Sequence, residues 1–257
     1  MPLNAGQHKV RRQGVSESRI DQQPAFVLHT TPWRETSLIV EVLTRDFGRM
    51  GLVARGAKRP TSHFRGLLTP FSPIAVSWSG RGDIKTLIRV DWLGGLSALC
   101  GDALLAAFYL NELLVRLLAR ADAHEALFSA YQRALHDLAR ADKESLEAGL
   151  RRFELDLLRE AGWLPALEHT PDGEPIVVDG LYRLDPHSGP RRVLAQEGAR
   201  ADPWVVSGAA LHALARRCWP DVKLATQCRH LLRALIAHHL DGRPLNTRRI
   251  FQDLKRL

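Results

Sequence analysis

The spacing of apolar residues changes once along this chain, at the Gly94-Gly95 pair. Before the pair, short runs rich in Val, Ile, Leu and aromatic residues are separated by turns such as Ser79 to Asp83, and several runs alternate between apolar and polar residues. Alternation with period two is typical of β-strands that bury one face. The sequence therefore predicts five strands, at residues 26–29, 37–44, 50–57, 71–78 and 84–93.

These five strands are predicted to close into a small barrel. About 70 residues are too few for a large sandwich, and the five-stranded oligonucleotide-binding barrel (OB-fold) is the arrangement that suits five closely spaced strands. In such a barrel, the segment from Arg55 to Phe71 is the loop that follows the third strand.

After Gly95 the apolar residues recur at helical spacing, which predicts helices with one buried face. Asp122 and Glu125 have the spacing of a capping box, and Gly162 stands where a helix is expected to end. The predicted helices are residues 99–118, 122–140, 142–161, 207–218 and 222–239. The predicted fold class is therefore α+β, with an N-terminal five-stranded OB-fold barrel followed by a mainly α-helical C-terminal domain.

This pattern predicts three segments: a disordered basic arm at residues 1–23, an OB-fold nucleic-acid-binding domain at 24–95, and a helical domain at 96–257. Within the helical domain, residues 163–203 are rich in Pro, Gly and Asp and are expected to form an irregular excursion. Its packing is expected to involve Trp163, Ile176, Val178, Leu181 and Tyr182.

Charge is distributed unevenly along the chain, which carries a net charge of +8. Residues 1–95 hold 14 Lys and Arg against 7 Asp and Glu, residues 96–180 hold 8 against 15, and residues 181–257 hold 14 against 6. Between Arg49 and Arg89 there are eight basic residues and one acid, Asp83. Such a run is either a solvated face or a surface that binds nucleic-acid phosphates.

We interpret this basic run as a phosphate-binding surface. The predicted DNA-binding residues are Arg49, Arg55, Lys58, Arg59, Arg65, Arg81 and Lys85, with Arg248 and Arg249 on a supplementary surface or a domain interface. Trp33 and Phe64 are candidates for base stacking or for the core, whereas Phe47 and Trp78 are expected mainly in the core. Before Arg248, Pro244 to Thr247 resembles a helix entry with Asn246 or Thr247 as its N-cap.

The sequence shows no pattern typical of an enzyme or of a cofactor site. It contains no phosphate-binding Gly loop of the Walker type, no nucleophile elbow and no zinc-protease motif. A nuclease metal site could be imagined from five acids of the 142–161 helix, which are Glu144, Glu147, Glu154, Asp156 and Glu160. Arginine neighbours on the same helix favour a solvated surface instead. We predict no catalytic residue, no metal and no cofactor.

Cellular location is predicted from what the chain lacks. No apolar run reaches the length of a membrane span, and its three cysteines are too scattered for a disulfide framework. A cytoplasmic, nucleoid-associated protein without membrane contact is expected. An RNA-binding OB-fold protein and a metal-dependent nuclease remain as alternatives at this point.

Several stretches resemble the RecO family of bacterial recombination mediators. The most specific are Glu35 to Ser37, the block from Gly56 to Phe71, Phe153 to Leu155 with Gly162, and the closing Leu245 to Leu254. The resemblance implies a protein that binds single- and double-stranded DNA, anneals strands, and works with RecR and single-strand-binding protein in loading RecA. Some family members carry a four-cysteine zinc module, but residues 163–203 contain no cysteine here, so no zinc is expected.

The resemblance also implies a receptor for the tail of single-strand-binding protein, which is acidic and ends in apolar residues and a free carboxylate. Such a receptor needs an apolar groove edged by arginine, because the guanidinium fork can bind both carboxylate oxygens. A groove is expected between the helices of residues 99–120 and 122–140. The candidate residues are Arg116, Arg120, Arg133 and Arg140, which could instead be i, i+4 partners of acids such as Glu112 and Asp137.

Overall fold

The computed structural model of the chain describes residues 19–95, 97–194, 202–218 and 221–247. Its N-terminal part is a closed barrel with the strand order β1-β2-β3-β5-β4, in which β3 and β5 run parallel and the other pairs run antiparallel. The strands are β1 (Arg19–Trp33), β2 (Ser37–Thr44), β3 (Gly48–Ala54), β4 (Pro73–Ser79) and β5 (Ile84–Trp92). This barrel confirms the predicted OB-fold.

The barrel interior is filled by the inward residues of the alternating strands. Val40, Val42 and Leu52 are completely buried there, and Trp78 is 1% exposed with its ring edge-to-face against Phe47 at 5.3 Å. Phe64 from the loop after β3 is also buried in this core. Of the aromatic residues considered for stacking, the core therefore takes Phe64 as well as Trp78 and Phe47.

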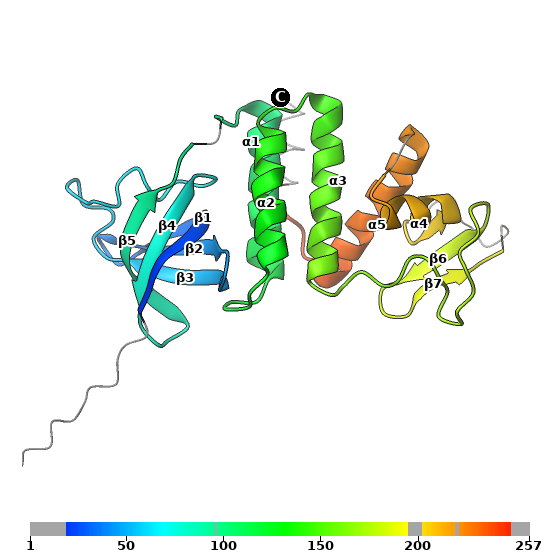
Figure 1. Cartoon of the computed structure of the whole chain (residues 1–257), viewed down its shortest axis with the longest axis horizontal. Helices are drawn as coiled ribbons and strands as arrows, with labels where there is room; N and C mark the ends of the chain where they lie inside the picture. The colour runs from blue at the N-terminus through cyan, green and yellow to red at the C-terminus, as the bar shows by residue number, and fades with distance from the viewer. Residues whose placement is uncertain (1–18, 96, 195–201, 219–220, 248–257) are drawn as a thin grey trace, which may run out of the picture.

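The helical part follows the barrel, and helices α1 to α5 and a small sheet lie beyond the barrel along the long axis of the molecule (Figure 1). The sheet has the order β7-β6-β8. The elements are α1 (Gly101–Leu117), α2 (Glu125–Leu138), α3 (Lys143–Glu160), β6 (Leu181–Asp185), β7 (Gly189–Arg192), β8 (Val205–Ser207), α4 (Gly208–Ala215) and α5 (Val222–His239).

The structure differs from the sequence prediction in one segment limit and in the regularity of one segment. Strand β1 begins at Arg19, before the expected start of the barrel at residue 24. The excursion at 163–203 is less irregular than expected, because Tyr182 and Leu184 alternate with exposed residues along β6 and pack into the helical core. Ile176 is buried as predicted, but Val178 is 55% exposed and does not hold the segment.

The capping box predicted at Asp122 does not form. Helix α2 begins at Glu125 with His124 as its N-cap, and no side chain caps it. The Asp122 backbone instead packs against the β2–β3 turn, where a Cβ on Gly48 would lie 1.6 Å from its carbonyl oxygen. The end of α3 is as predicted, since Gly162 has a φ of +71° and the N–H of Trp163 donates to the Leu158 carbonyl at 2.8 Å.

The outer face of the barrel packs directly on the helices. Phe26, Leu28 and Leu43 are buried in the same cluster as the apolar faces of the helices. Leu28 lies where the β1–β2 register shifts, and its carbonyl accepts a hydrogen bond from Asn111 Nδ2 at 2.9 Å. Asn111 Oδ1 in turn accepts one from the Tyr131 hydroxyl at 2.5 Å. A buried polar chain thus links α2, α1 and the barrel.

Candidate nucleic-acid interface

Part of the outer barrel face remains open, where β2, β3 and β5 lie side by side. The register pairs Ile39 with Val53 and Val53 with Thr86, and it places Ile84 two residues before Thr86 on the same face. Side chains of paired residues point to the same side of a sheet. These residues therefore form a continuous, largely apolar strip across three strands.

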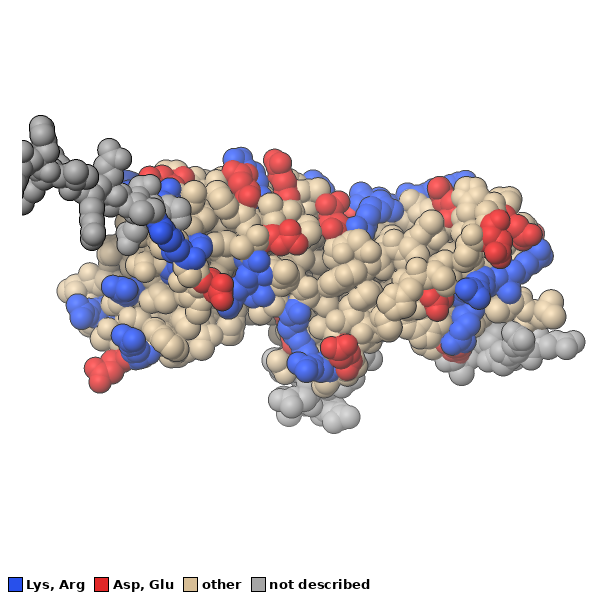
Figure 2. Space-filling model, turned by 90° about the horizontal axis from the view of Figure 1, so that it is seen from below, with Lys and Arg blue, Asp and Glu red and all other residues tan. Residues whose placement is uncertain are grey.

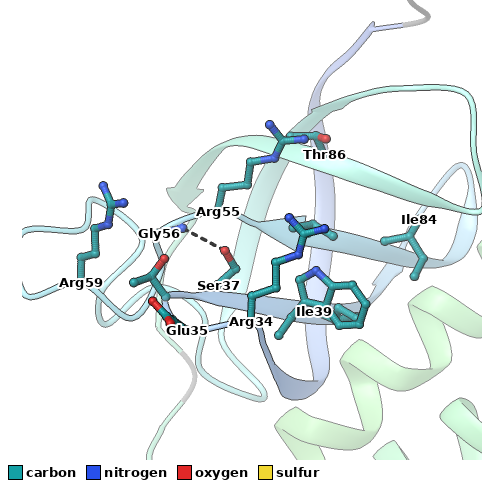
Figure 3. A pocket seen from close by; sticks show the side chains of 12 residues that line it. Arg34, Glu35, Ser37, Ile39, Arg55, Gly56, Arg59, Ile84 and Thr86 are labelled. Atoms are coloured by element: carbon teal, nitrogen blue, oxygen red, sulfur yellow. Dashed lines mark hydrogen bonds between the residues drawn. The ribbon is translucent and has the colours of Figure 1, made fainter.

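This strip is the floor of a groove of about 930 Å³. The β1–β2 turn borders the groove, as does the start of the loop that follows β3 (Figure 3). The residues that line it are Trp33, Arg34, Glu35, Thr36, Ser37, Ile39, Val53, Arg55, Gly56, Arg59, Ile84 and Thr86.

The groove carries a surplus of positive charge. Its lining has three arginines, Arg34, Arg55 and Arg59, and one carboxylate, Glu35 (Figure 3). Within the part of the chain that the structure describes, no carboxylate forms an ion pair with any of the three arginines. Their guanidinium groups are therefore available to an anionic ligand, and Arg suits phosphate because its fork donates two parallel hydrogen bonds.

The start of the basic loop is tied to the β1–β2 turn and the first residue of β2. The N–H of Lys58 donates to the Thr36 carbonyl at 2.8 Å, and the Gly56 N–H donates to Ser37 Oγ at 3.4 Å. Gly56 has a φ of +69°, a conformation that favours glycine. Because burial of Phe64 anchors the far part of the loop, its cations are held near the groove rather than on a free segment.

The predicted DNA-binding residues fall into separate groups in the structure. Arg55 and Arg59 line the groove, while Lys58 and Arg65 are exposed on the same loop. Arg81 is exposed on the β4–β5 turn, and the ammonium group of Lys85, in β5, donates to the Gly82 carbonyl of that turn at 2.9 Å. Arg248 and Arg249 lie outside the described residues.

Arg49 does not belong to this surface. It forms an ion pair with Glu41 at 2.8 Å and donates to the Leu118 carbonyl at 3.0 Å, and its side chain is 14% exposed. Glu41 also pairs with Arg120 from the α1–α2 loop. Because the α1–α2 loop covers its end of β3, Arg49 is engaged in the contact between the barrel and the helices and is not exposed beside the other predicted cations.

The four arginines proposed for the partner tail do not share one groove. Arg116 pairs with Glu112 at 3.3 Å and donates to the Pro244 carbonyl at 2.7 Å, and Arg120 pairs with Glu41. Arg140 is exposed just beyond α2. The predicted site between α1 and α2 is therefore not assembled from these residues.

Arg133 does line a second pocket, of about 250 Å³, between α2 and α3. Two further arginines and two carboxylates accompany it, with Arg217 paired to Asp156. The pocket is lined by Ala130, Arg133, Ala134, Asp137, Gly149, Arg152, Phe153, Asp156 and Arg217. On the face shown in Figure 2, basic and acidic side chains lie close together over the helices.

Sequence reasoning missed Arg34. This residue lies in the turn between β1 and β2 and has a φ of +52°, which is uncommon for a residue with a Cβ. Its position in the short connection from Trp33 to Thr36 could have identified it as a candidate site residue, because the β1–β2 loop borders the ligand face of an OB-fold. Groove residues Ile39 and Ile84 gave no such signal, since apolar strand residues are normally assigned to the core.

The sequence predicted that the acidic residues of α3 lie on a solvated surface, but one of them does not. Glu154 is completely buried, where it accepts a hydrogen bond from Tyr109 at 2.6 Å and pairs with Arg151 at 2.8 Å. Burial raises the pKa of Glu154, although the charge of Arg151 opposes that rise. Among the residues that the structure describes, no three His, Cys, Asp or Glu side chains are grouped to hold a metal ion.

Glu112 of α1 caps the start of the C-terminal segment. Its carboxylate accepts hydrogen bonds from the backbone N–H groups of Asn246 and Thr247 at 2.7 and 2.9 Å, where the backbone enters a helix. Although burial opposes ionisation, these bonds lower the pKa of Glu112. The predicted helix entry is present at Asn246 and Thr247, and Glu112 of α1 binds the first N–H groups of that entry; the residues that an Asn246 or Thr247 cap would bind lie outside the described residues.

Within the described residues, none of the helices could span a lipid bilayer.

Comparison with known families matches both parts of this architecture. A family model described as "Recombination protein O N terminal" matches residues 19–96, and one described as "Recombination protein O C terminal" matches residues 100–249. The chain is 49% identical over 243 residues to the DNA repair protein RecO of Ralstonia nicotianae, which covers 94% of this chain and 88% of that protein. The RecO protein of Aromatoleum aromaticum is 47% identical over 242 residues, covering 94% and 99% of the two chains.

Proposed function

Because this chain belongs to the RecO family of DNA repair proteins, we propose that it is a non-catalytic mediator that binds DNA in the groove across β2, β3 and β5. The observation that carries the proposal is the set of Arg34, Arg55 and Arg59 around that groove, with no ion-pair partner among the described residues. Phosphates of a DNA backbone suit these arginines, and the exposed Lys58 and Arg65 extend the same surface along the loop.

The groove supports a role in holding strands rather than in cutting them. Its lining offers guanidinium groups, hydroxyls and apolar side chains, with Glu35 as the only carboxylate, so it lacks the paired acids that hold catalytic metal ions in nucleases. A protein of this kind binds DNA strands, brings complementary strands together, and helps RecA replace single-strand-binding protein. RecR is the expected partner in this loading step.

We further propose that the pocket between α2 and α3 receives the acidic tail of single-strand-binding protein. Ala130, Ala134 and Phe153 offer an apolar surface, and Arg133 with Arg152 could bind a terminal carboxylate. This pocket replaces the groove between α1 and α2 that was expected from the sequence, because Arg116 and Arg120 are occupied elsewhere.

The DNA site is tested by replacing Arg55 and Arg59 together with Ala. Affinity for DNA of any sequence should fall, and the slope of log K against log salt concentration should become shallower by about 0.7 to 0.9 for each phosphate that the variant no longer binds. Annealing of complementary strands coated with single-strand-binding protein should slow in parallel. The matched control is the Arg191→Ala, Arg192→Ala variant, which removes the same charge from the exposed part of β7 in the small sheet.

An unchanged salt slope in the groove variant would remove the groove from the proposal. An equal decrease in affinity in both double variants would show that net charge, and not the groove, governs binding.

A further inference from the structure

Trp33 is unusual among the aromatic residues of the barrel because it faces the groove. It is the last residue of β1, it lines the groove, and it is 44% exposed. Phe64 and Trp78, by contrast, are 3% and 1% exposed in the barrel core. Because this indole is partly exposed and lines the groove, its ring is accessible to a ligand with a flat apolar surface.

The groove floor beside Trp33 has the same character. Ile39, Val53 and Ile84 line it, and Ile84 is 41% exposed. Their side chains carry no hydrogen-bonding atom that could contact the polar edge of a base. The cations are supplied from the surrounding turn and loop, so the groove has an apolar floor and a positively charged border.

Resting on the DNA-binding role proposed above, we infer that Trp33 stacks on a base of an unpaired strand, and that this contact makes the groove prefer single-stranded over duplex DNA. In a duplex, the faces of the bases are covered by their neighbours, and only phosphates and groove edges are accessible. An unpaired strand can turn its bases toward the floor while its phosphates remain at the arginines. The contact is independent of sequence, because every base has an aromatic face.

Arg34, the next residue in the chain, lies over one face of the Trp33 ring. Its guanidinium carbon lies 6.0 Å from the centre of the Trp33 ring, at the outer limit of a cation–π contact. The left-handed conformation of Arg34 directs the chain into the turn while keeping its charge beside the ring. A base stacked on the opposite face of Trp33 would leave this cation in place, close to the phosphate of the nucleotide.

The test compares three DNA ligands of equal length: a thymidine oligonucleotide, the same strand with abasic sites, and a duplex. The Trp33→Leu variant should bind the thymidine strand about 5- to 150-fold more weakly, the range expected for one stacked base. Its affinity for the abasic strand and the duplex should stay within twofold of the unmodified protein, and its salt slope should not change. Trp33→Phe should retain most of the affinity for the thymidine strand.

The matched control is Trp92→Leu, which removes a more exposed indole, at 62% against 44% for Trp33, that does not line the groove. If Trp33→Leu binds the thymidine strand as well as the unmodified protein does, or binds all three ligands more weakly to the same extent, the stacking role is overturned. The Arg55→Ala, Arg59→Ala variant distinguishes failure of the stacking role from failure of the groove as the DNA site. If Trp33→Leu has no specific effect but the arginine variant weakens binding to all three ligands, the groove remains the DNA site without a stacked base. If neither variant weakens binding, the groove itself is rejected.

Discussion

The two buried hydrogen bonds of Asn111, which link the barrel to the helices, should depend energetically on each other. Asn111 lies between the Leu28 carbonyl, at the irregular position of β1, and the Tyr131 hydroxyl of α2, and all three residues are at most 3% exposed. Replacing Asn111 by Leu preserves the side-chain shape but leaves two buried polar groups without their partner.

The expected free-energy changes follow from the number of unpaired groups. A buried polar group without its partner costs about 1 to 3 kcal/mol, so Asn111→Leu should destabilise the protein by about 2 to 6 kcal/mol. Tyr131→Phe leaves only the Asn111 oxygen unpaired and should cost about 1 to 3 kcal/mol. The double variant leaves only the Leu28 carbonyl unpaired. It should therefore be no less stable than Asn111→Leu alone, and the sum of the two single-variant destabilisations should exceed that of the double variant by about 2 kcal/mol or more.

Urea unfolding of the four proteins measures this coupling, provided that circular dichroism and tryptophan fluorescence report the same transition. Additive destabilisations, within about 0.5 kcal/mol, would show that the two hydrogen bonds act independently and would refute the reasoning. A change in the m-value for Asn111→Leu alone would instead indicate that the barrel and the helices unfold separately in that variant.

Three further predictions concern the junction, the C-terminal segment and the α2–α3 pocket. Gly48→Ala should destabilise the protein by about 2 kcal/mol or more, because alanine is strained at the positive φ of this position and its Cβ would overlap the Asp122 carbonyl oxygen. A melting temperature equal to that of the unmodified protein would contradict this. Since the folded state lowers the pKa of Glu112, its stabilising effect should be complete above the ordinary carboxyl pKa and should disappear as pH falls through the lowered value. Glu112→Gln should reduce this pH dependence of urea unfolding, and an unaltered acid limb would exclude the role. Arg133→Glu should weaken binding of a fluorescent peptide with the acidic tail of single-strand-binding protein by about tenfold or more, while Arg140→Glu should not; equal effects would argue against the pocket.

Local pattern was sufficient to predict most of the architecture. Inward positions of the strands, such as Val40 and Val42, alternate with outward ones, and this period gave the five strands and hence the barrel. The end of α3 was also predictable, because Gly162 adopts a left-handed conformation that its neighbours in the sequence already favour. The small sheet was not predicted, since β6, β7 and β8 are too short for a reliable period.

Contacts between distant segments explain the failures. Asp122 and Glu125 have the spacing of a capping box, but the contact of the Asp122 backbone with Gly48 gives this segment another conformation. Glu154 was expected on a solvated helix face, yet Tyr109 and Arg151 enclose it in the interior. The burial is not recognisable from helix spacing alone, because Tyr109 comes from another helix.

Arg49 and Arg55 have the same sequence signal but different surroundings in the fold. Alternation places both on the outer side of β3 or of its extension, and both belong to the basic run that predicted a phosphate-binding surface. The α1–α2 loop covers the Arg49 end, where Glu41 neutralises the cation, while the Arg55 end remains open at the groove. Strand periodicity is a property of neighbouring residues and can be read from the chain. The exposure of an outward residue depends on which distant segment packs over it, so the surroundings of each cation follow from how the helices pack on the barrel.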